Sequence, residues 1–163
     1  MVRFPFCRGG LRMLDPETVV LRAKTSDLEL ARRAIIDLNL RTSQHRVKFD
    51  KAALREFLAD SKKYLILAIR KRHVLGSLYG YALKHPHRRA PQFFLYGIDV
   101  RAEYRNQGIG TALVHHFVAE AKRAQAFEVW VLTNRTNRSA MAMYAHAGFR
   151  RSGFGEVMLE LAL

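Results

Sequence analysis

The chain of 163 residues has one cysteine, Cys7, and no apolar run of the roughly 18 residues that a membrane span requires. A lone cysteine cannot form an internal disulfide, which suits a reducing compartment. The histidine pairs His85/His87 and His115/His116 are more typical of surface and helix positions than of a metal site. We therefore expect a cytoplasmic protein without a membrane segment or a metal, large enough to form its own core.

Acidic residues are also scarce, with 14 Asp and Glu against 28 Lys and Arg, for a net charge of +14. The basic residues are dispersed along the chain, which is compatible with a solvated basic surface. They also predict a field that favours an anionic partner, such as nucleic acid, acidic protein or a polyphosphate cofactor. The first 14 residues contain no acid, and their apolar stretch is too short for a signal peptide. We expect residues 1–15 to form a disordered N-terminal extension, with a start at Met1 or Met13 left open.

Hydrophobic periodicity and capping residues predict one domain of α/β (α+β) class over residues 16–163. Ser26 and Glu29 suggest a capping box, and Asp50 and Asn137 are further candidate helix caps. The strands are expected at 18–23, 64–69, 74–83, 93–100, 127–132 and 156–161, the helices after Ser26 and Asp50, at 108–124 and from Asn137 to His146, and a polar loop at 85–91. This order predicts a mixed sheet of about six to seven strands with about four helices.

A glycine loop lies between the strand at 93–100 and the helix at 108–124, with the sequence RNQGIG from Arg105 to Gly110. It lacks the lysine of a Walker A loop, and Leu113 occupies the position where a dinucleotide fingerprint needs a small residue. Backbone amides at such a loop, together with the helix dipole, favour binding of a pyrophosphate. The pattern alone is weakly specific.

A second pattern follows downstream, N-x-x-A-x-x-x-Y-x-x-x-G-F, formed by Asn137, Ala140, Tyr144, Gly148 and Phe149. Combined with the glycine loop, it resembles the two signature motifs of the GNAT superfamily of N-acetyltransferases. The segments 93–100 and 129–133 are most similar to the type I aminoglycoside 3-N-acetyltransferases.

The resemblance implies acetyl-CoA as cosubstrate and a sheet that splays between the strands at 93–100 and 127–132. The pyrophosphate would be bound by the backbone of Arg105, Asn106, Gln107, Gly108, Ile109, Gly110 and Thr111, and the pantetheine would pair near Ile98 and Val100. Tyr144 would protonate the departing thiolate while a primary amine is acetylated directly. Asn137 would be a helix cap, a cofactor contact or both. Members of the family often form homodimers, which is an expectation here as well.

The sequence departs from this subgroup at Gly97, where relatives commonly carry a carboxylate three residues before the valine. Asp99 would share the face of Gly97 if the strand is regular, which makes it our candidate base or amine-orienting group; a bulge would break that parity. An Asp paired with an arginine and deprotonation through water are the alternatives.

The acceptor is left open. Residues 134–138 read NRTNR in place of an acidic loop, which counts against a polycationic acceptor, although Asp99, Glu156 and Glu160 could still form a receptive site. The acceptor is an aminoglycoside-like small molecule or a protein or peptide amine. The competing class is a non-catalytic domain that senses CoA or binds nucleic acid.

Overall fold

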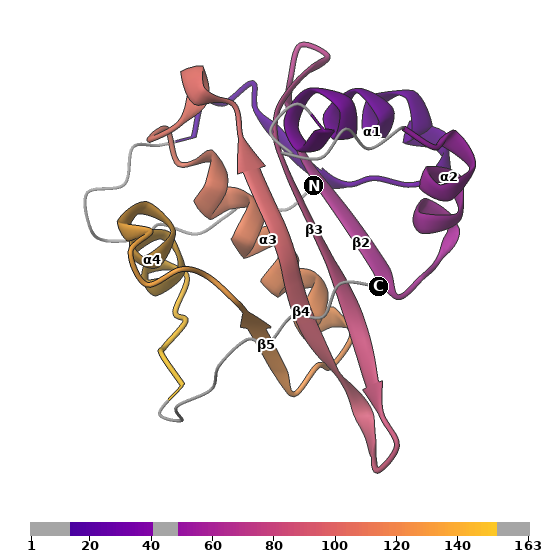
Figure 1. The fold of residues 1–163 in the computed structure, drawn as a ribbon, viewed down its shortest axis with the longest axis vertical. Helices are drawn as coiled ribbons and strands as arrows, with labels where there is room; N and C mark the ends of the chain where they lie inside the picture. Colours follow the sequence, from indigo (N-terminus) through magenta and orange to yellow (C-terminus); the bar gives the residue numbers. More distant parts are fainter. Residues whose placement is uncertain (1–13, 41–48, 153–163) are drawn as a thin grey trace.

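A five-stranded mixed sheet organises the described part of the chain, which comprises residues 14–40 and 49–152 of this computed structural model (Figure 1). The strands lie side by side in chain order: β1 (Val19–Arg22), β2 (Lys63–Arg70), β3 (His73–His85), β4 (Arg88–Val100) and β5 (Glu128–Val131). Neighbours are antiparallel from β1 to β4, and β5 is parallel to β4. The α+β class is confirmed, but the predicted six to seven strands are not matched, and the strand expected at 156–161 lies outside the described residues.

Four α-helices accompany this sheet, as predicted: α1 (Leu28–Ala34), α2 (Lys51–Ala59), α3 (Ile109–Arg123) and α4 (Arg138–His146). The cap at Asp50 is confirmed, because its carboxylate accepts from the amides of Ala52 and Ala53 at 2.8 and 3.1 Å. The capping box at Ser26 is wrong. A turn of 3₁₀ helix precedes α1, and the Asp27 carboxylate accepts from the Lys24 amide at 2.9 Å.

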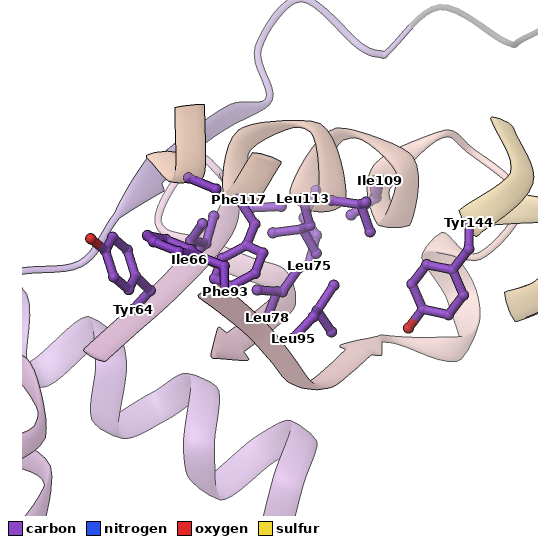
Figure 2. Close-up of a cluster of buried hydrophobic side chains, with 13 residues drawn as sticks. Tyr64, Ile66, Leu75, Leu78, Phe93, Leu95, Ile109, Leu113, Phe117 and Tyr144 are labelled. Atoms are coloured by element: carbon purple, nitrogen blue, oxygen red, sulfur yellow. The ribbon is translucent and has the colours of Figure 1, made fainter. Parts of the chain in front are cut away.

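Two hydrophobic layers sandwich the sheet. On one face α3 buries Ile109, Leu113 and Phe117 against side chains of β2 to β4, and Figure 2 shows this cluster, with Phe93 and Leu95 among its members. On the other face, buried residues of α1, of the π-helical turn that follows it (Ile35–Leu40) and of α2 meet the alternate residues of β2. They are Ala31, Ala34, Leu38 and Leu54, which pack against Leu65 and Leu67. The period-two alternation of β2 therefore fills both layers.

The β2–β3 hairpin has the turn that the sequence predicts, whereas the β3–β4 hairpin does not. Lys71 and Arg72 form the expected turn between β2 and β3, with φ of 45° and 69°. The predicted loop at 85–91 is wrong, because β3 continues to His85 and β4 begins at Arg88. Pro91 is tolerated in β4 because the register shifts between Leu83 and His85, which leaves this stretch out of the regular ladder. Among the described helices, none has the length and the apolar character needed to cross a membrane.

Candidate active site

The glycine loop connects β4 to α3 at the C-terminal end of β4. Asn106 and Gly108 have positive φ of 58° and 79°, and Gly108 is the residue that precedes the first turn of α3. The Arg105 guanidinium donates to the Val100 carbonyl at 3.1 Å, and the Gln107 side-chain amide donates to the Glu103 carbonyl at 3.0 Å. The side chains of this loop thus fold back on its own backbone and leave its amides to other partners.

Those amides form a continuous group of unpaired donors. The Arg105 amide donates to Ala102 at 3.3 Å and the Ala112 amide to Gly108 at 2.9 Å. Between them, the amides of 106–111 donate to no acceptor within the described residues. Unpaired amides at the start of a 15-residue helix provide hydrogen bonds and positive potential for a phosphate. The loop therefore fits the pyrophosphate of acetyl-CoA.

The edge of β4 beside this loop pairs with no other strand of the described part. Parallel pairing with β5 is confined to Gln92–Leu95 and Glu128–Val131, and β4 continues past it to Val100 (Figure 1). The Arg101 amide donates to the Leu75 carbonyl of β3 at 2.9 Å. Because successive residues of a strand direct their backbone groups to opposite sides, the amides of Ile98 and Val100 point away from β3. An extended amide chain such as pantetheine can pair with this edge.

Tyr144 is held beside the start of α3 by the packing of α4. Its side chain is buried, with 6% exposed, and its ring lies 5.6 Å from that of Phe149. A Cβ on Gly110 would lie 2.7 Å from the Met143 sulfur, so a side chain at residue 110 would require the Met143 side chain of α4 to shift. Burial raises the pKa of Tyr144 to about 12, which keeps the hydroxyl protonated at neutral pH and able to donate a proton.

Asn137 begins α4 as a helix cap. Its side-chain oxygen accepts from the Ala140 amide at 3.1 Å. This bond occupies the side chain in the described structure and accounts for the asparagine without a ligand. The expected contact with the cosubstrate remains a prediction.

A bulge in β4 places Gly97 and Asp99 on the face opposite α3. Gly97 pairs with Tyr79 and Leu95 with Gly80, so Tyr96 is the extra residue. The ladder is regular from Gly97 to Val100, and Gly97 and Asp99 therefore share a face. Asp99 is half-buried, and burial raises its pKa, an effect that the nearby Arg105 opposes. A carboxyl group in this setting has a higher pKa than a solvated aspartate.

Tyr79 occupies the space that a side chain at residue 97 would fill. A Cβ on Gly97 would lie 2.6 Å from Tyr79 Cε1 and 3.2 Å from its hydroxyl oxygen. The Tyr79 ring lies 5.1 Å from that of Tyr96, and burial, with smaller contributions from Tyr96, Tyr81 and Asp99, raises the Tyr79 pKa to about 12. Tyr79 was not among the residues predicted for the site, although its alternation with Tyr81 in β3 indicated that both share one face.

Tyr79 belongs to a larger group of rings on this face, which we call the aromatic wall and which comprises Tyr79, Tyr81, Phe94, Tyr96 and Trp130. Tyr96 is 58% exposed and contacts the rings of Tyr79, Tyr81 and Phe94 at 5.1 to 5.9 Å. Phe94 stacks on Trp130 at 4.1 Å, and the buried Trp130 indole N–H has no hydrogen-bond partner among the described residues. The wall gives the Asp99 side of β4 an apolar surface on which the Tyr96 ring is exposed. No three His, Cys, Asp or Glu residues of the described part are grouped to hold a metal ion.

The comparisons with known proteins agree with this geometry. The Acetyltransferase (GNAT) family matches residues 33–149, and the chain belongs to this family. A [ribosomal protein bS18]-alanine N-acetyltransferase of Escherichia coli K12 is 31% identical over 58 residues, 36% of this chain and 39% of that protein. Human N-acetyltransferase 8B is 26% identical over 118 residues, 72% of this chain and 49% of that protein. The chain thus spans less than half the length of each of these relatives.

Solved structures show the same fold at lower identity. An aminoglycoside acetyltransferase from an uncultured soil metagenomic sample, in complex with sisomicin, superposes with a TM-score of 0.79 at 19% identity, covering 90% of this chain and 97% of that one. A ribosomal-protein-alanine N-acetyltransferase from Brucella melitensis superposes with a TM-score of 0.67 at 14% identity, covering 88% and 99%. At these identities the likeness establishes the fold.

Proposed function

We propose that this protein is an acetyl-CoA-dependent N-acetyltransferase that transfers the acetyl group directly to a primary amine. The observation that carries the proposal is the convergence of three features at the C-terminal end of β4. They are the unpaired amides of 106–111, the free strand edge at Ile98 and Val100, and the buried, protonated Tyr144. Membership of the GNAT family supports it.

Each feature has a role in the proposed reaction. When bound, acetyl-CoA supplies an acetyl thioester, and the amine forms the new C–N bond as the C–S bond breaks. The loop amides hold the pyrophosphate, and a β4 amide near Ile98 to Val100 stabilises the charge that develops on the acetyl oxygen. Asp99 orients the amine and takes its proton, and Tyr144 donates a proton to the departing sulfur.

The acceptor side of the site favours one ammonium group over a polycation. Asp99 lies on the same face of β4 as Tyr79, whose pKa it helps to raise, and Tyr79 contacts the exposed ring of Tyr96. An exposed aromatic ring attracts a single cation by cation–π contact. A polycationic aminoglycoside needs several carboxylates, and the net charge of +14 opposes its approach. We therefore propose a peptide or protein amine as the acceptor, with an aminoglycoside-like molecule, and with it a role in antibiotic resistance, as the second candidate. The similarity to the bS18-alanine N-acetyltransferase supports the first, and the fold shared with the sisomicin complex supports the second.

The test is a thiol-release assay with acetyl-CoA and a panel of short peptides, aminoglycosides and polyamines. Tyr144→Phe should lower kcat by about 10²–10⁴-fold, since it removes a general acid, and should leave CoA affinity unchanged. Tyr64→Phe is the matched control, because Tyr64 is also 6% exposed and lies at the opposite end of the same cluster (Figure 2). We expect the control to keep kcat within about threefold of the wild type, since Tyr64 is remote from the loop.

Three outcomes would contradict the proposal in different ways. CoA binding by calorimetry without thiol release from any acceptor would indicate a CoA sensor. Equal kcat in the Tyr144→Phe and wild-type proteins would remove Tyr144 as the acid. Turnover with aminoglycosides but with no peptide would contradict the peptide or protein acceptor and make an aminoglycoside-like molecule the acceptor.

A further inference from the structure

The hairpin between β3 and β4 extends past the rest of the sheet. Pairing of β3 with β2 ends at Tyr81, and pairing of β4 with β5 begins at Gln92. Residues 83–90, which we call the hairpin tip, therefore form a two-stranded ribbon that projects beyond both neighbours (Figure 1, lower end). A stretch that pairs with neither flanking strand leaves its side chains available on both faces of the ribbon.

The hairpin tip carries positive charge with no acid. Its sequence is LKHPHRRA, and Lys84, Arg88 and Arg89 are all exposed. None of the three forms an ion pair with any residue of the described part. The other two described arginines on β-strands do have partners, since Arg22 pairs with Glu120 at 3.7 Å and Arg70 with Asp15 at 3.2 Å. As far as the described part of the chain is concerned, the three cations of the tip are thus available to contact an anionic partner.

Flat side chains lie among these cations. Phe127, just before β5, is 41% exposed, and the Arg88 guanidinium lies 4.6 Å from its ring centroid. The His85 ring is 5.6 Å from Phe127 and 5.6 Å from His87. Exposed or partly exposed rings beside guanidinium groups that have no carboxylate partner among the described residues are the combination that holds bases by stacking and phosphates by charge.

We propose that the hairpin tip and Phe127 form a binding surface for single-stranded nucleic acid. Lys84, Arg88 and Arg89 contact phosphates, and Phe127 with His85 offers a stacking platform for a base. An acidic protein surface would match the charges but would leave the exposed rings without a counterpart, which is why we favour the nucleic acid. A strand rises about 3.3 Å per residue, so the tip lies roughly 40 Å along β4 from Val100 and the glycine loop. The surface is therefore separate from the proposed acetyl-transfer site.

The experiment measures binding of a fluorescein-labelled single-stranded 20-mer, as RNA and as DNA, by fluorescence anisotropy between about 50 and 200 mM salt. The test variant is Arg88→Glu/Arg89→Glu. The matched control is Arg33→Glu/Arg55→Glu, which changes the net charge equally at two exposed arginines of α1 and α2. Phe127→Ala tests stacking, and a polyglutamate competitor tests an acidic-protein partner.

The wild type should bind with an affinity that falls steeply with salt. Arg88→Glu/Arg89→Glu should weaken binding at least about tenfold and reduce the slope of log K against log salt by about 1.4, the value for two phosphate contacts on a single strand. The control should stay within about threefold of the wild type. Phe127→Ala should weaken binding about tenfold, the effect of one lost base stack. Tighter binding of RNA than DNA, or the reverse, identifies which nucleic acid is preferred.

Three results would overturn the inference: no binding by the wild type at about 50 mM salt, an equal loss in the control, or polyglutamate that competes as well as RNA while Phe127→Ala has no effect. Thiol release should be unchanged in the tip variants, so a failure here is distinct from a failure of the proposed acetyl transfer.

Discussion

Replacing Gly97 by alanine probes the packing that most distinguishes this site. The new Cβ would lie 2.6 Å from Tyr79 Cε1, and the ring cannot retreat freely because Tyr96 packs beside it at 5.1 Å. Overpacking of this kind costs about 1–3 kcal/mol. Alanine in a strand gains about 0.5–1 kcal/mol over glycine, because glycine loses more backbone freedom on folding. We expect Gly97→Ala to lower the free energy of unfolding by about 1–2 kcal/mol.

The cause of that loss can be isolated by a double-mutant cycle with Tyr79→Ala, followed by urea unfolding monitored by circular dichroism. Once the ring is absent, Gly97→Ala should stabilise by about 0.5 kcal/mol, which gives a coupling of about 2 kcal/mol. Gly148→Ala is the control. Its Cβ would meet nothing within 4 Å, and its φ of +90° makes the substitution costly whether or not Tyr79 is present. An equal cost of Gly97→Ala in both backgrounds would refute the assignment of Tyr79 as the constraint.

Two further predictions concern the chemistry and the helix packing. The proposed base, Asp99, would act when deprotonated, and burial raises its pKa, so kcat/KM should fall as pH drops through a value above the ordinary 3.8. In Asp99→Asn this acidic limb should be absent and the plateau lower by about 10²-fold or more. An unchanged pH profile would favour deprotonation through water. Gly110→Ala should raise KM for acetyl-CoA, since its Cβ would lie 2.7 Å from Met143 Sδ and would force that side chain to shift beside the loop. Met143→Ala should restore most of the affinity if the helix contact is the cause, as measured by calorimetry with CoA.

Features that depend on a few neighbouring residues could be predicted from the sequence. Asp50 and Asn137 cap their helices through bonds to amides two or three residues away, and Lys71–Arg72 form the tight turn expected between two apolar strands. The prediction of a capping box at Ser26 was wrong because two local pairings compete there. The same stretch offered Asp27, whose carboxylate reaches the Lys24 amide, and the local sequence does not decide between two such pairings.

Features that depend on strand register could not be predicted. The proline and histidines of 85–91 suggested a loop, but an irregular ladder absorbs Pro91 and lets β3 and β4 run to 13 residues each. The bulge at Tyr96 is equally invisible in the sequence, because an extra residue in one strand is defined only by its partner strand. The placement of Tyr79 over Gly97 depends on this bulge and on the register between β3 and β4.

The bulge also bears on which carboxylate serves the reaction. It switches the faces of β4, so that Phe93 and Leu95 before it and Ile98 and Val100 after it all face α3. Gly97 and Asp99 then lie on the face of the aromatic wall, and Tyr79 fills the position at residue 97. A carboxylate at residue 97 would have to displace that ring, whereas one at residue 99 does not. Glycine at residue 97 leaves the room that the Tyr79 ring of β3 occupies, so the two residues depend on each other. With residue 97 closed to a carboxylate, the candidate base is Asp99, two residues further along the same face.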